Sequence, residues 1–366
     1  MQSELSLQKQ VREMKFNPAN ERLKHRYFGW LRDARQLGDH TIDQVAKALD
    51  RFEDYTRRRD FREFRTEQAS GFKKHLAAQN GQRSGERLTK ATTTTTLYAL
   101  RDFVRWLSDQ KGFRGRLLRT DADYFNPSRQ DEAISRAPRK MQVPSLEQIR
   151  VMLDSMPDAS PVDRRNRAIV ALIMLTGVRD DAAASVCLKH LDLDERELYQ
   201  DGRNVRTKFR KTFSTWFFPV GEEFVEVLAE WKAELETVHG FGPDDPLFPR
   251  TVVSFGEDGA VQPAQIGKEG WANADPIRKL FKEACKIPGL PDFKPHSLRH
   301  TLGRLGQFMC SGPAELKAWS QNLGHEEVLT TLTSYGNLPD YMQKDLIAGI
   351  GRRVLPAARA GSVTSA

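Results

Sequence analysis

The chain has few cysteines and no long apolar segment. Its three cysteines, Cys187, Cys285 and Cys310, are odd in number and share no spacing typical of a metal site. No apolar run approaches the roughly 18 residues that a membrane span requires. The first ten residues, MQSELSLQKQ, lack the apolar core of a signal peptide. These absences argue against a membrane protein and a disulfide-rich secreted one, and we expect a soluble protein of the reducing cytoplasm.

Acidic residues are scarce in the first part of the chain. The 366 residues carry a net charge of +8. Residues 1–140 contain 30 Lys and Arg against 19 Asp and Glu, a net charge of +11, and the remainder contains 27 against 30, a net charge of −3. A basic first module beside a near-neutral second one indicates a polyanion-binding module next to a separate working domain. A basic domain that is merely well solvated would show the same balance.

The first module has the apolar periodicity of helices. Apolar residues recur at helical intervals over 18–38, 42–52, 69–76 and 97–107. Pro18 suits the first turn of a helix, and Gly38 suits a helix end. Four helices of this length form a bundle of about 100 residues.

Five consecutive threonines, Thr92 to Thr96, begin the fourth of these helices. Threonine is a mediocre helix former, so the run is compatible with a simple solvated first turn. Alternatively, hydroxyl and backbone N–H groups at this helix N-terminus bind phosphate, assisted by Arg87 and Lys90.

A change of composition separates the two modules. The segment DADYFNPSRQDEAISRAPRKMQVP contains three prolines and no helical period, which is typical of a linker. Beyond it, Ser145 begins a capping box, and residues 167–175 predict a buried helix that ends at Gly177. Residues 198–220 alternate and are rich in β-branched and aromatic side chains, which predicts a small hairpin sheet. Residues 251–271 are expected to form a surface loop.

Four separated stretches of the second module offer side chains suited to phosphate. LTGVRDD contains Arg179, and FRKTF contains Arg210 and Lys211, with Lys208 just before it. HSLRH contains His296, Arg299 and His300, which a helix would place on one face, and NLGHEEVLTTLTSYGNL contains His325 and Tyr335. Each has an ordinary structural interpretation by itself, such as a helix cap for His325 or a core position for Tyr335.

The histidine spacing also raises the possibility of a metal site. His296 and His300 stand at i and i+4, as in a zinc-protease helix. That motif requires a glutamate after the first histidine, where this chain has Ser297. Arg299 on the same face would repel a dication, so we expect no metal.

Taken together, the four stretches resemble those of the tyrosine recombinases, the phage-integrase-like enzymes that exchange DNA strands. The family carries a T-G-x-R helix end, a lysine in a β-hairpin turn, an H-x-x-R helix, an L-G-H and then a nucleophilic tyrosine. The resemblance implies these catalytic residues: Arg179, Lys211, His296, Arg299, His325 and Tyr335. It also implies a supporting role for His300 and DNA contacts for Arg87, Lys90, Thr92, Lys208 and Arg210.

The resemblance spans nearly the whole chain and implies its organisation. The expected fold is mainly α-helical with a small antiparallel β-sheet, in a helical core-binding domain and a catalytic domain. The expected boundaries are an N-terminal extension at 1–17, the core-binding domain at 18–125, a linker at 126–143, the catalytic domain at 144–350 and a disordered tail at 351–366. The partners implied are double-stranded DNA, further copies of the chain as a tetramer on DNA, and accessory recombination proteins, with no cofactor. A nucleoid-associated, prokaryote-like location follows.

Phosphoryl transfer explains why such residues are needed. Negative charge spreads over the phosphate in the transition state, and Arg179 and Arg299 can clamp it with forked hydrogen bonds. Tyr335 would form a covalent link to DNA, and a hairpin lysine would protonate the departing 5′-oxygen. His296 suits acid–base assistance to the tyrosine, and His325 suits a hydrogen bond to the phosphate.

The sequence departs from the family pattern in two places. Many relatives have a carboxylate three residues after the first arginine, where this chain has Ala182, so Asp180 or Asp181 is a candidate substitute. The tyrosine often follows the L-G-H histidine by nine residues, whereas Tyr335 follows it by ten. Tyr341 is the alternative nucleophile.

Two other functions fit the same pattern. One is a DNA-binding regulator on this scaffold that has lost catalysis, against which the intact set of six polar residues argues. The other is a type IB topoisomerase, which relaxes DNA without exchanging partners.

Within the hairpin, alternation from Val205 predicts that Lys208 lies within a strand, and Lys211 is predicted at the turn.

Overall fold

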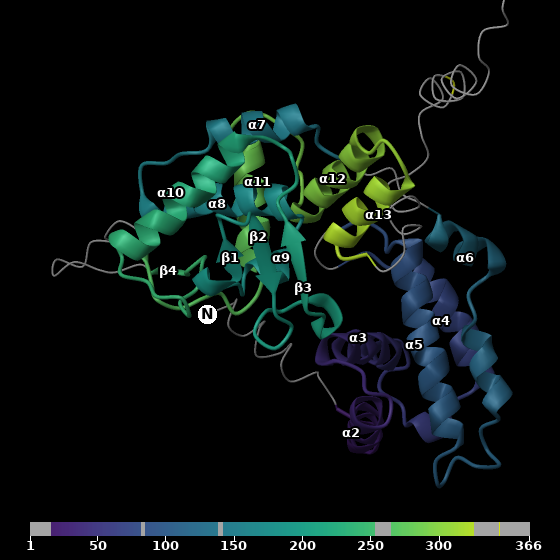
Figure 1. Ribbon diagram of the computed structural model, residues 1–366. Helices are drawn as coiled ribbons and strands as arrows, with labels where there is room; N and C mark the ends of the chain where they lie inside the picture. Colours follow the sequence, from purple (N-terminus) through teal and green to yellow (C-terminus); the bar gives the residue numbers. More distant parts are fainter. Residues whose placement is uncertain (1–15, 82–84, 138–141, 253–264, 326–343, 345–366) are drawn as a thin grey trace, which may run out of the picture. The chain divides into compact units, whose positions relative to one another are not determined.

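The computed structural model divides the chain into two compact units, residues 1–139 and 140–366 (Figure 1). It describes residues 16–81, 85–137, 142–252, 265–325 and 344. Within those ranges, every helix is too short or too polar to span a bilayer. The mainly helical fold with small antiparallel sheets that the sequence predicted is confirmed.

The first unit is built from helices around an aromatic core. Its helices are α2 (Pro18–Asp33), α3 (Asp39–Tyr55), α4 (Thr66–Ala78), α5 (Lys90–Ser108) and α6 (Arg129–Arg136), with 3-10 turns at Phe61–Glu63 and Arg119–Phe125. The Phe52 ring packs edge-on against Phe72 at 5.2 Å and Phe125 at 5.4 Å between centroids. Because all three rings are buried, they hold α3, α4 and the second 3-10 turn together.

Helix α6 is a difference from the sequence prediction, which expected no regular structure between 126 and 143. The Ser128 side chain accepts a hydrogen bond from the backbone N–H of Asp131 and so caps this helix. Two contacts then attach α6 to α5: Lys90 pairs with Asp131 at 2.5 Å, and the Tyr98 hydroxyl donates to Glu132 at 2.5 Å. A helix this short carries too little apolar periodicity to be recognised, and it is stabilised by those polar contacts.

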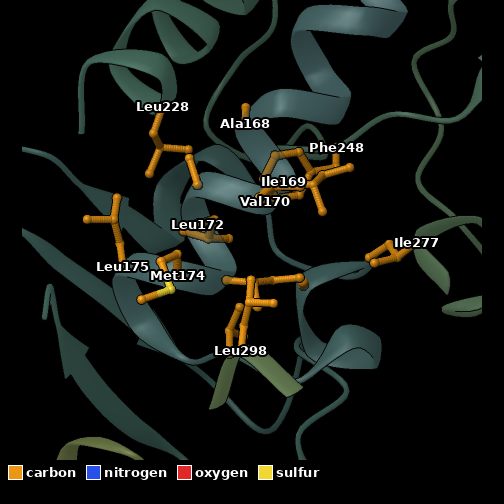
Figure 2. Packing of buried hydrophobic residues seen from close by; sticks show 14 of the residues in the cluster. Ala168, Ile169, Val170, Leu172, Met174, Leu175, Leu228, Phe248, Ile277 and Leu298 are labelled. Atoms are coloured by element: carbon orange, nitrogen blue, oxygen red, sulfur yellow. The ribbon is translucent and has the colours of Figure 1, made fainter. Parts of the chain in front are cut away.

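The second unit surrounds one buried helix. Its helices are α7 (Leu146–Ser155), α8 (Pro161–Thr176), α9 (Asp180–Ala183), α10 (Glu222–Thr237), α11 (Asp275–Lys286), α12 (Pro295–Met309) and α13 (Pro313–Asn322). Ser160 and Asp163 form a capping box at the start of α8. Figure 2 shows side chains of α8 beside Leu228 of α10, Ile277 of α11 and Leu298 of α12. Since α8 is buried on all sides from Ala168 to Thr176, its C-terminal end has a fixed position.

Two small antiparallel sheets complete this unit. Strands β1 (Leu191–Asp192), β2 (Glu197–Gln200) and β3 (Phe213–Trp216) form the first sheet, in which Leu198 pairs with Thr215. The predicted hairpin is therefore present, but Lys208 lies in a 3-10 turn, Lys208–Arg210, and not in a strand. Strands β4 (Thr251–Val252) and β5 (Gln265–Ile266) pair where the sequence predicted only a loop.

Candidate active site

The end of α8 places Arg179 at the edge of the core. The Thr176 hydroxyl donates to the carbonyl of Leu172 at 2.7 Å and accepts from the N–H of Val178 at 3.2 Å. Gly177 ends the helix with φ 61°, in the left-handed region. Arg179 then occupies the position just before α9 and is half-buried. The T-G-x-R pattern thus makes a helix end, a left-handed turn and a second helix start within four residues.

Replacing Gly177 with alanine is expected to destabilise the second unit by about 1–3 kcal/mol. A Cβ atom at this position would lie 2.9 Å from Leu323 Cδ2 and 3.1 Å from Leu302 Cδ1, in a backbone conformation that L-residues rarely adopt. Gly312→Ala is the matched control, because Gly312 has φ −161° and nothing near its Cβ position. Urea denaturation midpoints would test the difference, and equal midpoints for both variants would contradict it.

Arg299 of α12 joins two of the motifs through its guanidinium. Nη1 donates to the carbonyl of Gly177, and Nη2 donates to the carbonyl of Leu323 at 2.6 Å. The side chain is only 4% exposed. Arg299 therefore connects the end of α8 to the L-G-H segment that follows α13, and its position is set by bonds at both of its terminal nitrogens.

The hairpin is attached to the same segment. Asn322 accepts from the backbone N–H of Trp216 at 2.8 Å and donates to the Trp216 carbonyl at 2.8 Å, so its amide imitates a neighbouring strand. A Cβ on Gly324, which has φ 70°, would come within 2.9 Å of the Phe213 ring. Because Phe213 begins β3 two residues after Lys211, and Gly324 precedes His325, these contacts bring the lysine-bearing end of β3 to the L-G-H segment.

Three histidines join the two arginines in one cluster. The pKa of His296 is lowered to about 4 by partial loss of hydration and then by the positive neighbours His300, Arg299 and Arg179, although the residue is exposed at the surface. The pKa of His325 is also lowered to about 4, by burial and then by Arg299 and Arg179. Burial and neighbouring arginines lower the pKa of His300, whose ring stands edge-on to His296 at 4.9 Å.

These pKa directions decide the charge of the cluster. With pKa values below 7, His296 and His325 are neutral at physiological pH, so the positive charge of the site belongs to the guanidiniums. A neutral imidazole can accept a proton, which protonated histidine cannot do. A bound anion would raise both pKa values by favouring the charged imidazoles.

Arginines from other elements bind the two carboxylates that follow Arg179. Asp180 accepts from Arg278 Nε at 2.7 Å, and Asp181 accepts from Arg206 Nε at 2.9 Å. The second of these pairs connects the loop between β2 and β3 to α9. Whether either carboxylate replaces the acidic residue expected at Ala182 stays a prediction.

The predicted DNA contacts outside the cluster lie in two places. In the first unit, Arg87 is exposed, Thr92 is half-buried and Lys90 is paired with Asp131. The run Thr92–Thr96 is not a solvated turn, because Thr93, Thr94 and Thr96 are buried. In the second unit, Lys208 and Arg210 are exposed on the hairpin tip, which we define as Lys208–Arg210. The ring between them, Phe209, was missed by the sequence reasoning.

The two candidate nucleophiles and the possibility of a metal site remain to be considered. Tyr335 and Tyr341 lie outside the described residues, so the choice of nucleophile stays a prediction. Among the residues that are described, no group of three or more His, Cys, Asp or Glu side chains is arranged to hold a metal ion.

The helical fold with its small sheet, and the cluster of two arginines and three histidines, are features of enzymes that break and rejoin DNA strands. The model of the phage integrase family matches residues 144–340, and the chain belongs to this family, the tyrosine recombinases. The resemblance inferred from the sequence is therefore confirmed.

Relatives and solved structures agree with this assignment. The tyrosine recombinase XerC of Lactobacillus delbrueckii subsp. bulgaricus is 26% identical over 255 residues, which are 68% of this chain and 72% of that protein. XerC of Actinobacillus succinogenes is 24% identical over 309 residues, 84% of this chain and 89% of that protein. The XerH site-specific recombinase, in a post-cleavage complex with a palindromic difH substrate, is similar in fold with a TM-score of 0.57 at 18% identity, over 86% of this chain and 81% of that one.

Proposed function

We propose that the chain is a site-specific DNA recombinase that cuts and rejoins strands through a covalent 3′-phosphotyrosine intermediate at Tyr335. The observation that supports this best is the position of Arg299, whose bonds to Gly177 and Leu323 gather the arginine, histidine and L-G-H motifs into one cluster. Neutral histidines beside two guanidiniums suit a site that binds an anion and moves protons.

The proposed reaction exchanges one phosphodiester bond for another. The Tyr335 oxygen attacks the phosphorus, a bond forms between that oxygen and phosphorus, and the bond to the 5′-oxygen breaks. His296 takes the tyrosine proton, and Lys211 protonates the departing 5′-oxygen. Arg179 and Arg299 stabilise the charge on the non-bridging oxygens, with a hydrogen bond from His325.

The intermediate explains how strands are exchanged without an energy source. A free 5′-hydroxyl of a second DNA strand attacks the phosphotyrosine, releases the tyrosine and restores a phosphodiester. The same chemistry without a second duplex is that of a type IB topoisomerase. A chain that bound DNA and formed no covalent link would be the silent regulator.

The partners proposed are double-stranded DNA and further copies of this chain. The first unit, with its exposed Arg87 and its α5 N-terminus near Thr92, would bind the duplex as a core-binding domain. Exchange between two duplexes requires several active sites, which is consistent with a tetramer on DNA. The role within the cell would be that of an integrase or transposase of a mobile element acting in the cytoplasm, assisted by accessory recombination proteins.

A two-stage experiment tests the proposal. Duplexes bound by the protein are first selected from a random-sequence pool, and nicked versions of the selected duplex then serve as suicide substrates. The expected result is a protein–DNA adduct on a denaturing gel, followed by strand transfer to a second labelled duplex. Binding without an adduct would identify the silent regulator, and relaxation of supercoiled DNA without strand transfer would identify the topoisomerase.

Chelator is expected to leave this reaction unchanged, whereas salt is expected to weaken the binding of DNA. Adduct formation should be unchanged in EDTA, because charge stabilisation is assigned to Arg179, Arg299 and Lys211. Duplex binding should weaken steeply with salt. The logarithm of the association constant should fall against the logarithm of the salt concentration with a slope of about −0.9 for each phosphate contacted. Adduct yield measured against chelator, and the dissociation constant measured against salt, check both parts. Loss of the adduct in EDTA with recovery on adding magnesium or zinc would contradict the mechanism.

A further inference from the structure

The hairpin tip holds an aromatic ring out in the solvent. Phe209 is 79% exposed, more than any other large hydrophobic side chain in the described part of the chain. Its backbone has φ 60° and that of Arg210 has φ 54°, so two consecutive non-glycine residues adopt the left-handed conformation. This conformation is uncommon for a bulky residue. Neither feature is stabilised by burial, which suggests a function outside the packing of this unit.

The loop below the tip is built to keep this shape. A Cβ at Gly202 would lie 2.1 Å from the carbonyl oxygen of Arg210, so only glycine allows the two sides of the loop to approach this closely. The Gly202 N–H donates to the Thr212 hydroxyl at 2.9 Å, and the Thr207 hydroxyl donates to the Lys211 carbonyl at 2.7 Å. These bonds close the loop at its base.

Arg206 anchors the loop to the helix that follows Arg179. Its Nε donates to Asp181 of α9 at 2.9 Å, and its Nη2 donates to the carbonyl of Trp271 at 3.1 Å. The backbone N–H of Arg206 donates to Ser185 at 2.9 Å. The tip is therefore held in a defined position relative to the arginine and histidine cluster.

Cationic residues precede and follow Phe209 in the sequence, and one of them lies over its ring. The Lys208 ammonium lies 4.9 Å from the centroid of the Phe209 ring, and the exposed Arg210 follows it. An exposed apolar ring whose two sequence neighbours are cationic fits a partner with an anionic backbone and apolar stacking faces, which is the chemistry of nucleic acid. The surface of an anionic lipid membrane is also negatively charged and is the alternative partner. The loop is anchored beside Arg179, where the phosphate of a bound DNA would lie. We therefore favour DNA over lipid as the partner of the hairpin tip.

We propose that Phe209 is a wedge that inserts at a base step next to the scissile phosphate, partly unstacks it, and so positions the phosphate for attack. Lys208 and Arg210 bind the phosphates on either side of the wedge. Inserted apolar side chains deform duplexes in this way in other DNA-binding proteins. The location of the step beside the scissile phosphate rests on the proposed function, whereas insertion into DNA does not.

A fluorescence experiment tests insertion without requiring cleavage. The selected duplex carries 2-aminopurine at successive positions across the cleavage region, and unstacking raises the fluorescence of this base. The wild-type protein and Phe308→Ala, which removes a 60% exposed ring from α12 of the same unit, are expected to raise the fluorescence at one step. Phe209→Ala is expected to bind the duplex and leave the fluorescence unchanged, and Phe209→Leu to give an intermediate rise.

Cleavage provides a second measurement. Phe209→Ala should form the covalent adduct about 10- to 100-fold more slowly than wild type on fully paired DNA. A mismatch at the same step should restore most of the rate, because unstacking no longer requires the wedge. A mismatch should not restore the rate of Lys211→Ala.

The outcomes separate this proposal from the recombinase proposal. A Phe209-dependent fluorescence change without any wild-type adduct would overturn the recombinase and support the wedge. Adduct formation with equal fluorescence changes in wild type and Phe209→Ala would overturn the wedge alone. Binding to vesicles of anionic phospholipid that is lost in Phe209→Ala, with no effect of this variant on DNA, would show that the tip is a lipid contact and overturn the proposal.

Discussion

The variant Tyr335→Phe is expected to bind the selected duplex with unchanged affinity and to form no covalent adduct. The substitution removes one oxygen and little volume, so contacts to the DNA persist while the attacking atom is lost. A nicked suicide substrate would trap the wild-type adduct, which a denaturing gel separates from free DNA. Because Tyr335 is assigned as the nucleophile, the expected loss is complete and is the largest effect of any variant described.

Tyr341→Phe is the matched control for this assignment. Tyr341 lies six residues further along the chain and undergoes the same chemical change in its variant. It is expected to retain the adduct, because the sequence around Tyr335, LTTLTSYG, has the family's approach to the tyrosine. An adduct that persists in Tyr335→Phe and disappears in Tyr341→Phe would transfer the role of nucleophile to Tyr341.

The parts of the fold that the sequence predicted well are those with local signals. Pro18 begins α2, and Gly177 ends α8 in a left-handed conformation, as proline and glycine at these positions indicate. The predicted buried helix, 167–175, lies within α8, and its apolar residues from Ala168 onward are buried because a helix surrounded by protein needs apolar residues on every face. Each of these features depends on residues within a few positions of one another.

The parts that were wrong or missed depend on contacts distant in the sequence or on unusual backbone conformations. Helix α6 is stabilised by Asp131 and Glu132 pairing with residues of α5, which no periodicity reveals. Lys208 was placed in a strand because alternation continues past the end of β2, whereas the chain turns through left-handed residues that are not glycine. Neither Phe209 nor Arg210 is a glycine, so the sequence placed the turn at Lys211, directly after the turn that the structure shows.

The candidate site shows the same division. The motif pattern identified Arg179, His296, Arg299 and His325, and the structure brings these four into one cluster, although their catalytic roles stay predictions. The sequence could not show that two bonds of Arg299 go to backbone carbonyls. Spacing placed His296, Arg299 and His300 on one helix face but could not give their charges, and the lowered pKa values of the two histidines favour the neutral imidazoles at neutral pH.

The variant Lys211→Ala is expected to slow adduct formation by about 10²- to 10⁴-fold, the usual contribution of a positioned general acid. Lys211 is half-buried and lies between the hairpin tip and β3, where its carbonyl is fixed by Thr207 and the nearby Phe213 packs on Gly324. Lys208→Ala is the matched control, because Lys208 is exposed on the hairpin tip beside Phe209. Its loss should weaken duplex binding and have a smaller effect on the cleavage rate of bound DNA.

A substrate with sulfur in place of the 5′-bridging oxygen distinguishes acid catalysis from binding. A thiolate leaves without receiving a proton, so this substrate should restore adduct formation by Lys211→Ala nearly to the wild-type rate. It should not rescue Arg299→Lys, because a lysine cannot keep both guanidinium bonds, to Gly177 and Leu323, that hold the cluster together, and protonation of the leaving group is not the missing step. Rescue of Lys208→Ala in place of Lys211→Ala would move the general acid to the hairpin tip, and rescue of neither variant would show that no hairpin lysine protonates the leaving group.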